Sequence, residues 1–244
     1  MSDPGQDGRE AAGAAGAGPR YAARTKYEAP GRAARYARRS ERRNREEAAL
    51  VDRVLAGRRA PRTVLDAPCG TGRLSKVWLA RGAAVRAADL SPAMREAASE
   101  ALRGIPGLLG VDPLDLEAPV EAGAPRHDLV LCFRLLHHLP DAATRRRVLA
   151  SLAARSCGDV LVSFHHPVSV HHAARALRRL VTGRRGDRHA VLLRRLVADA
   201  ESVGLRFVRA RALSPGLRDL WVALFETGAD RGAPRSPADE GSRA

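Results

Sequence analysis

The stretch that decides the fold is Val64-Leu65-Asp66-Ala67-Pro68-Cys69-Gly70-Thr71-Gly72-Arg73. It reads as a short apolar strand, an acid at the strand end, a glycine-containing loop and the start of a helix. Glycines in such a loop let backbone N–H groups approach a ligand where a side chain would block them. A second acid, Asp89, follows another short apolar run at residues 83–88. The pattern predicts a ligand site with a carboxylate at each of two strand ends.

The charge of the two strand ends indicates the kind of ligand. A carboxylate at Asp66, directly before the loop, would repel the pyrophosphate of a dinucleotide, which argues against a nicotinamide-dependent oxidoreductase. A ligand with an ammonium group and a ribose suits both acids. Asp66 can hold the amine, directly or through water, and Asp89 can accept hydrogen bonds from both ribose hydroxyls. S-adenosylmethionine (SAM) carries both groups, so we expect SAM as the cofactor.

Three segments together resemble class I SAM-dependent methyltransferases of the small-molecule type, and are similar to the ubiquinone and menaquinone biosynthesis branch. They are residues 64–74, 87–94 and 128–139. The resemblance extends over roughly residues 60–226 and is specific for the cofactor, whereas it says little about the methyl acceptor. It implies a Rossmann-like, doubly wound α/β fold with a mostly parallel seven-stranded sheet and an antiparallel C-terminal edge hairpin.

The alternation of apolar runs and helical segments predicts the same parallel sheet with helices on both faces. Strands are expected at residues 63–66, 84–89, 108–112, 128–133, 158–164, 205–212 and 219–226. Helices are expected at residues 72–81, 92–103, 142–155 and 187–203. No helix separates the last two strands, and the Ser-Pro-Gly turn at residues 214–216 predicts that they form a hairpin.

Composition divides the chain into four parts, one of which contains an insertion. Residues 1–20 are Gly/Ala-rich and residues 229–244 are rich in Pro, Arg, Ser and Asp, so both are expected to be disordered tails. Residues 21–60 are expected to form an N-terminal lid and helix. Residues 61–228 are expected to form the SAM-dependent methyltransferase domain, in which residues 165–186 are an insertion over the acceptor pocket.

Within the N-terminal extension, Ser40 can cap a helix that runs to about Ala56. Its apolar residues are expected on one face: Ala48, Leu50, Val51, Val54 and Leu55. Its charged residues are expected mostly on the other: Arg42, Arg43, Arg45, Glu46, Glu47 and Arg53. We expect this helix to pack beside the first strand of the sheet. The segment before it holds all three tyrosines and is either a lid over the cofactor or a solvated basic arm.

The resemblance also implies a set of cofactor-binding residues. They are Asp66, Ala67, Cys69, Gly70, Gly72, Asp89, Leu90, Asp115, Leu116 and Phe133. In this set Leu90 would lie against the adenine ring, and Asp115 with the N–H of Leu116 would contact the adenine edge. Asp112, which ends the third strand directly, is the competing candidate for that contact. The backbone of Phe133 would touch the cofactor.

The acceptor side is expected after the fourth and fifth strands. His137 and His138 are candidate catalytic bases, since a histidine near the transferred methyl can take a proton from the acceptor; the alternative is a structural role. Arg134, His165 and His166 are candidate substrate contacts and favour an anionic group. No carboxylate or cysteine completes the histidine cluster that begins at His165, so no metal site is predicted.

Charge and composition narrow the acceptor class. The net charge is +15, but almost all basic residues are arginines, a bias that a GC-rich coding sequence produces, and aromatic residues make up 4% of the chain. A nucleic-acid partner is therefore not favoured, and a small-molecule acceptor is expected, with methyl transfer to an O, N or C atom. An RNA or protein methyltransferase and a non-catalytic SAM-binding scaffold protein are the alternatives.

The three cysteines lack CxxC spacing and no apolar run suits a membrane span, so a cytoplasmic location is expected.

Overall fold

The computed structural model of the chain describes residues 41–170 and 189–228. The expectations for both tails, for the tyrosine-containing segment and for most of the acceptor-pocket insertion fall outside these ranges. The strands are β1 (Thr63–Asp66), β2 (Ala84–Asp89), β3 (Leu108–Pro113), β4 (His127–Cys132), β5 (Ser156–His165), β6 (Leu205–Ala212) and β7 (Leu220–Thr227). The helices are α3 (Glu41–Leu55), α4 (Arg73–Leu79), α5 (Pro92–Leu102), the 3-10 helix η1 (Leu136–His138), α6 (Ala142–Ala154) and α8 (Leu193–Glu201).

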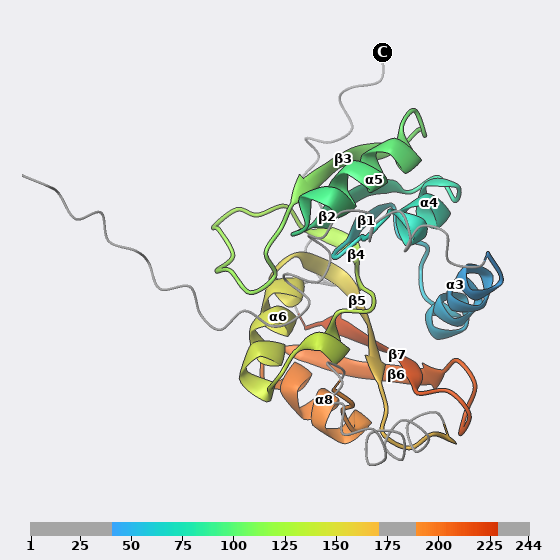
Figure 1. Cartoon of the computed structure of the whole chain (residues 1–244). Coiled ribbons are helices and arrows are strands. Elements are labelled where there is room, and N and C mark those ends of the chain that lie inside the picture. The colour runs from blue at the N-terminus through green and yellow to red at the C-terminus, as the bar shows by residue number, and fades with distance from the viewer. Residues whose placement is uncertain (1–40, 171–188, 229–244) are drawn as a thin grey trace, which may run out of the picture.

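The seven strands form one sheet in the order β3-β2-β1-β4-β5-β7-β6 (Figure 1). Strands β1 to β5 pair in parallel, while β7 lies between β5 and β6 and is antiparallel to both. The predicted α/β fold and its antiparallel edge hairpin are therefore confirmed. The direction of winding reverses between β1 and β4, and open parallel sheets bind their ligands at such a position.

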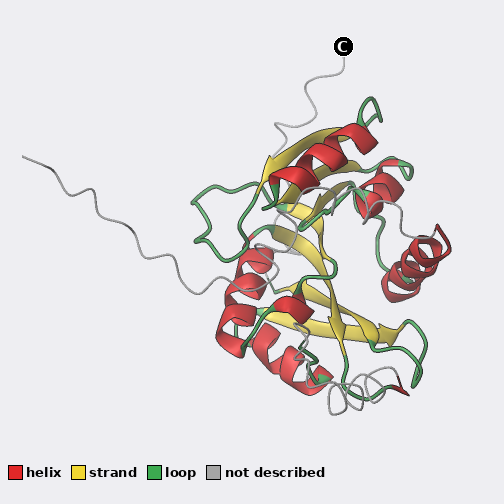
Figure 2. Cartoon of the chain, in the orientation of Figure 1, coloured by secondary structure: helices red, strands yellow, loops and turns green. Residues whose placement is uncertain are grey.

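Helices cover both faces of the sheet (Figure 2). Because side chains alternate along a strand, neighbouring residues of β4 belong to different cores. Val130 and Cys132 pack with α6 and α8, whereas Leu129 and Leu131 pack with α3, α4 and α5. Two buried cores therefore hold the central strands in place from both sides.

Two expectations about helices are wrong in position. Helix α3 packs on β6 and β7 and against α4, not beside β1. Helix α8 begins at Leu193, not near residue 187. The reason for the later start is that the residues before it pair across the sheet end: the N–H of His189 donates to the His137 carbonyl and the N–H of Val191 donates to the His165 carbonyl.

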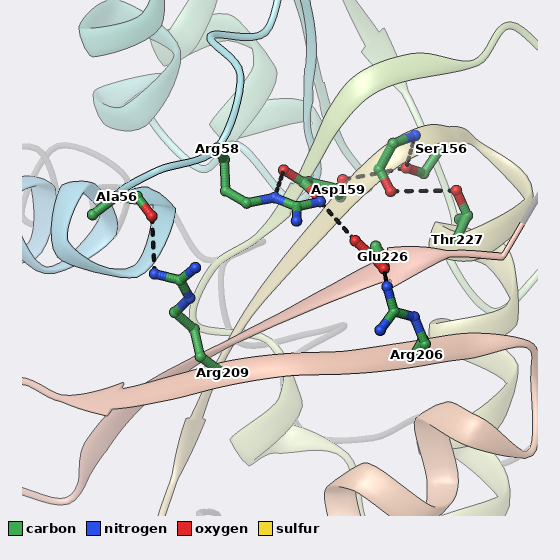
Figure 3. Close-up of polar contacts among 9 residues, drawn as sticks. Ala56, Arg58, Ser156, Asp159, Arg206, Arg209, Glu226 and Thr227 are labelled. Carbon is green, nitrogen blue, oxygen red and sulfur yellow. Dashed lines mark hydrogen bonds and ion pairs between the residues drawn. The ribbon is translucent and has the colours of Figure 1, made fainter. Parts of the chain in front are cut away.

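A polar cluster fixes the end of α3 to the sheet (Figure 3). Arg58 donates from Nε to Asp159 of β5 at 3.0 Å and from Nη2 to Glu226 of β7 at 2.8 Å. These two acids are register partners at the amino-end edge of β5. Arg209 of β6 donates to the carbonyl of Ala56 at 2.9 Å. Three strands therefore hold the chain where it leaves α3.

None of the helices within the described ranges combines the length and the apolar character that crossing a membrane requires.

We predict that Arg58→Ala lowers the free energy of unfolding by about 3 kcal/mol, because Asp159 loses the partner of a largely buried ion pair. Arg81→Ala is the matched control, since Arg81 and Asp52 form an exposed pair worth at most about 1 kcal/mol. Urea unfolding of both variants measures the difference. Equal losses in the two variants would contradict the role assigned to Arg58.

Candidate functional site

The glycine loop lies where the winding of the sheet reverses. Its backbone is tied to both neighbouring strands: the N–H of Ala67 donates to Leu131 of β4 at 2.9 Å, and the N–H of Cys69 donates to Ala88 of β2 at 2.8 Å. Gly70 and Gly72 have φ angles of 56° and 75°, which side chains disfavour. A Cβ on Gly72 would also lie 2.9 Å from Leu102 of α5. The two glycines are thus required by conformation, and Gly72 also by close packing.

Asp66 lies at the predicted strand end but points toward helix α4. Its Oδ2 atom accepts hydrogen bonds from the backbone N–H of Ser75 at 3.0 Å and from the Ser75 hydroxyl at 2.7 Å. The side chain is 1% exposed. Burial raises the pKa of Asp66 to about 6, and the two bonds from Ser75 oppose that rise. Both bonds from Ser75 use Oδ2, so they leave Oδ1 as the carboxylate oxygen for other donors.

Asp89 joins the end of β2 to the glycine loop. Its Oδ2 atom accepts from the N–H of Gly70 at 2.9 Å, and its Oδ1 atom accepts from the N–H of Ser91 at 2.9 Å. Burial raises the pKa of Asp89, and the bonds from Ser91 and Gly70 lower it in part. Each carboxylate oxygen has two lone pairs, so both retain capacity to accept a ribose hydroxyl.

The expected adenine side lies beyond β2 and β3. Leu90 is 36% exposed and offers an apolar surface directly after Asp89. Asp112 pairs with Arg86 of the neighbouring strand, whereas Asp115 accepts the N–H of Glu117 at 2.9 Å in the following turn. Both candidate acids for the adenine edge thus already interact with a neighbouring part of the chain.

The remaining expected cofactor residues are buried. They are Ala67, Cys69, Leu116 and Phe133. Burial raises the pKa of the Cys69 thiol, so this thiol stays protonated at neutral pH and has a packing role in the tight turn. Phe133 and Cys69 belong to the core on the α3 side, and Leu116 belongs to the core on the α6 side.

Arg134 follows β4, as expected, but its guanidinium pairs with Glu47 of α3. Glu47 was expected on the solvent face of its helix, and that expectation is wrong because its side chain is 1% exposed. The sequence did hold a signal for this burial. Position 47 precedes Leu50, Val51 and Val54 at spacings of three, four and seven residues, which places all four on one helix face. The guanidinium of Arg134 therefore has an acidic partner inside the protein.

Histidines from β5 and η1 gather at the carboxyl ends of β4 and β5. The rings of His137 and His165 stack with centroids 4.1 Å apart, and the ring of His138 lies 4.1 Å from that of His137. All three side chains are buried. His166 turns toward Trp221 instead, with ring centroids 4.9 Å apart. The structure thus brings three of the four candidate histidines into one cluster, while His171 and His172 lie outside the described residues.

Sequence reasoning missed Asp219, which immediately precedes β7. Its Oδ2 atom lies 3.2 Å from Nδ1 of His165, close enough for an ion pair when the imidazole is protonated. Strand β7 is antiparallel to β5, so its first residues meet the last residues of β5 at one edge. No sequence motif marks this pairing, because it depends on the way β7 inserts into the sheet.

Comparison with known proteins gives a consistent family. Residues 65–157 match the family described as "Methyltransferase domain". A ubiquinone biosynthesis O-methyltransferase of Nitrosomonas europaea is 32% identical over 94 residues, which cover 38% of this chain and 40% of the relative. The same-named protein of Bordetella avium is 32% identical over 161 residues, covering 62% and 65%. The chain thus spans about two-fifths of the length of several of these curated relatives.

Solved structures share the fold at low sequence identity. The magnesium protoporphyrin IX methyltransferase of Synechocystis PCC 6803, solved with bound SAM, has a TM-score of 0.62 and 16% identity, covering 84% of this chain and 95% of that chain. The pyocyanin biosynthetic protein PhzM has a TM-score of 0.57 and 17% identity, covering 74% of this chain and 55% of that chain.

The raised pKa of Asp66 predicts a specific pH dependence of stability. The pKa of Asp66 is about 6 in the folded protein and 3.8 in the unfolded chain, so the folded protein binds the proton of Asp66 more tightly. Ionisation of Asp66 therefore lowers the stability of the native state as the pH rises from about 4 to 6. That cost is about 3 kcal/mol at neutral pH. We expect Asp66→Asn to gain stability relative to the wild type over this interval, measured by urea unfolding at several pH values.

The serine beside Asp66 provides the control. Ser75→Ala removes one hydrogen bond to the carboxylate, so the fall in stability between pH 4 and 6 should extend to higher pH and become larger. Wild-type and Asp66→Asn curves that run parallel over this interval would exclude a raised pKa at Asp66.

Proposed function

We propose that this chain, which belongs to the class I SAM-dependent methyltransferases, binds SAM at its glycine loop and transfers the methyl group to a small-molecule acceptor. The observation that carries the proposal is the link between Asp89 and Gly70. A carboxylate at the end of β2 and the N–H groups of the loop after β1 form one connected site where the winding reverses.

The residues at this site fit the groups of SAM. Asp89 has acceptor capacity for the ribose hydroxyls, and the exposed side chain of Leu90 provides an apolar contact for adenine. The buried acid Asp66 supplies the negative charge for the amine side of the ligand. When bound, SAM supplies a methyl group on a sulfonium, which is already a reactive leaving group. The protein then has to align the acceptor and exclude water, effects that reach roughly 7–11 kcal/mol in favourable cases.

The histidine cluster supports an acceptor that carries a proton on oxygen or nitrogen. In the proposed step His165 takes that proton, the acceptor atom forms its bond to the methyl carbon, and the carbon–sulfur bond breaks to leave S-adenosylhomocysteine (SAH). Asp219 serves as a positioning residue, because it lies beside Nδ1 of His165 and stabilises the imidazolium that forms. His137, stacked on His165, is the alternative proton acceptor. The name of the curated relatives favours oxygen as the acceptor atom.

The competing functions predict different partners. The end of β4 carries Phe133-Arg134-Leu135-Leu136, without the Asn/Asp-Pro-Pro-aromatic turn of enzymes that methylate exocyclic base amines, so adenine-N6 and cytosine-N4 chemistry are not favoured. An RNA or protein acceptor and a SAM-binding scaffold remain as outcomes of the tests below. A cytoplasmic location belongs to the same proposal.

We predict that Asp89→Ala weakens SAM binding at least tenfold, because the ribose hydroxyls lose their acceptor and the loop loses its tie to β2. Isothermal titration calorimetry measures the affinity, with circular dichroism to verify that the variant is folded. Asp52→Ala is the control, since Asp52 of α3 pairs with Arg81 on the exposed surface and should leave SAM affinity unchanged. Unchanged affinity in Asp89→Ala would refute the ribose assignment, and no binding by the wild type would refute the proposed function.

The acceptor is tested with methyl-labelled SAM against panels of phenols, carboxylic acids and amines, and against total RNA. We expect label transfer to a small molecule. For the acceptor found, Asp219→Asn should lower kcat about 100-fold at neutral pH while SAH affinity is retained, because the variant stabilises the imidazolium less. Transfer to RNA alone would favour the alternative function, and an unaltered kcat would exclude Asp219 from the proton transfer.

A further inference from the structure

We infer that Glu47 is a positioning residue of the cofactor site, so that helix α3 forms part of that site instead of being an appendage to it. The inference rests on the proposed function, because it concerns the affinity for the same cofactor. It depends on different residues, however: one buried carboxylate and the two arginines that flank the glycine loop and the end of β4.

The contacts of Glu47 connect three segments of the chain. Its Oε1 atom pairs with Nη2 of Arg134, and its Oε2 atom lies 3.4 Å from both Nε of Arg134 and Nη2 of Arg73. Arg73 also donates to the side-chain oxygen of Asn44, one turn earlier in α3. A carboxylate that is this deeply buried needs charged partners, so the side chain of Glu47 is held in one place.

Both arginines are attached to parts of the backbone that border the expected cofactor. Arg73 is the first residue of α4, directly after Gly72 of the loop. Arg134 directly follows Phe133 at the end of β4, and its φ of 64° is the only positive value among non-glycine residues of the described ranges. Such a conformation is costly and persists only where surrounding contacts enforce it. Here the N–H of Arg134 donates to Ser163 of β5 at 2.6 Å, and its guanidinium is held by Glu47.

Helix α3 can fix these two segments because it is itself anchored elsewhere. Beyond its C-terminal end, Arg58 binds acids of β5 and β7, and Arg209 of β6 binds the carbonyl of Ala56 (Figure 3). Leu50 and Val54 of the helix are fully buried in the core that α4 shares. The helix thus has a fixed position on one part of the sheet. The contacts of Glu47 with Arg73 and Arg134 then hold the glycine loop and the end of β4 relative to the helix.

Charge alone would predict the opposite effect of removing the carboxylate. Glu47 balances one of its two arginines, so Glu47→Gln leaves more positive charge beside the loop that receives the amino-acid part of SAH. Simple attraction for the ligand carboxylate would then strengthen binding. If Glu47 acts by position, the released arginines and the strained backbone of Arg134 relax, and binding weakens. The sign of the change separates the two explanations.

The test is calorimetric titration of the full-length chain with SAH, which lacks a transferable methyl group. We expect Glu47→Gln to raise the dissociation constant about tenfold. Glu46→Gln is the matched control: it changes the adjacent glutamate, which pairs with Arg218 on the partly exposed surface, and should leave the constant within twofold of the wild type. Val54→Ala removes buried core volume from the same helix, so it should lower Tm without changing SAH affinity.

Each result decides between specific possibilities. Tighter or unchanged SAH binding by Glu47→Gln would overturn the inference. So would a loss of SAH affinity in Glu47→Gln that is no larger than the loss in Val54→Ala, if the two variants have a similar fall in Tm. If Glu47→Gln does not fold, Glu47→Asp retains the charge but withdraws the carboxylate from both arginines, and it should also weaken SAH binding several-fold. Wild-type protein that fails to bind SAH would overturn the proposed function itself, a result distinct from equal binding by wild type and variant.

Discussion

The structure depends on carboxylates that are buried at the carboxyl-end edge of the sheet and must find partners there. Asp66 binds the start of α4 through Ser75, and Asp89 binds the glycine loop through Gly70. Glu47 joins α3 to the end of β4 through Arg134. Because an unpaired buried charge is costly, each acid fixes the segment that it contacts. The conformation of the loop is therefore held by hydrogen bonds within the protein.

This arrangement separates two sides of the site. The proposed cofactor side consists of backbone N–H groups and acids around β1 and β2, and local hydrogen bonds set its geometry. The proposed acceptor side consists of His137 after β4 and His165 at the end of β5, with Asp219, which precedes β7, beside His165. The antiparallel insertion of β7 is what carries an acid to the histidines. Both sides lie at the carboxyl ends of parallel strands, an arrangement that suits the transfer of a group between two ligands.

Much of the fold and of the local structure around the glycine loop could be predicted, since each depends on local sequence. The apolar runs gave the strand positions to within two residues, and the glycine loop with its following helix start lies between β1 and α4, as predicted. Glu47 was expected on the charged face because it carries a charge, although its helical spacing to Leu50 and Val54 places it on the buried face of α3. The start of α8 was misplaced because His189 and Val191 pair with distant carbonyls, a contact that local helix propensity does not contain.

The sequence by itself determined the α/β class, the order of the elements and the glycine loop between two acids, because these follow from periodicity and from short-range turn chemistry. Only the tertiary structure decided which partners the charged side chains choose. Arg134 turns to Glu47, Asp66 to Ser75, and Asp219 to His165. These pairings join residues that are close only after the sheet has formed. Each pairing is required because the tertiary structure buries the charged group, and a buried charge without a partner is costly.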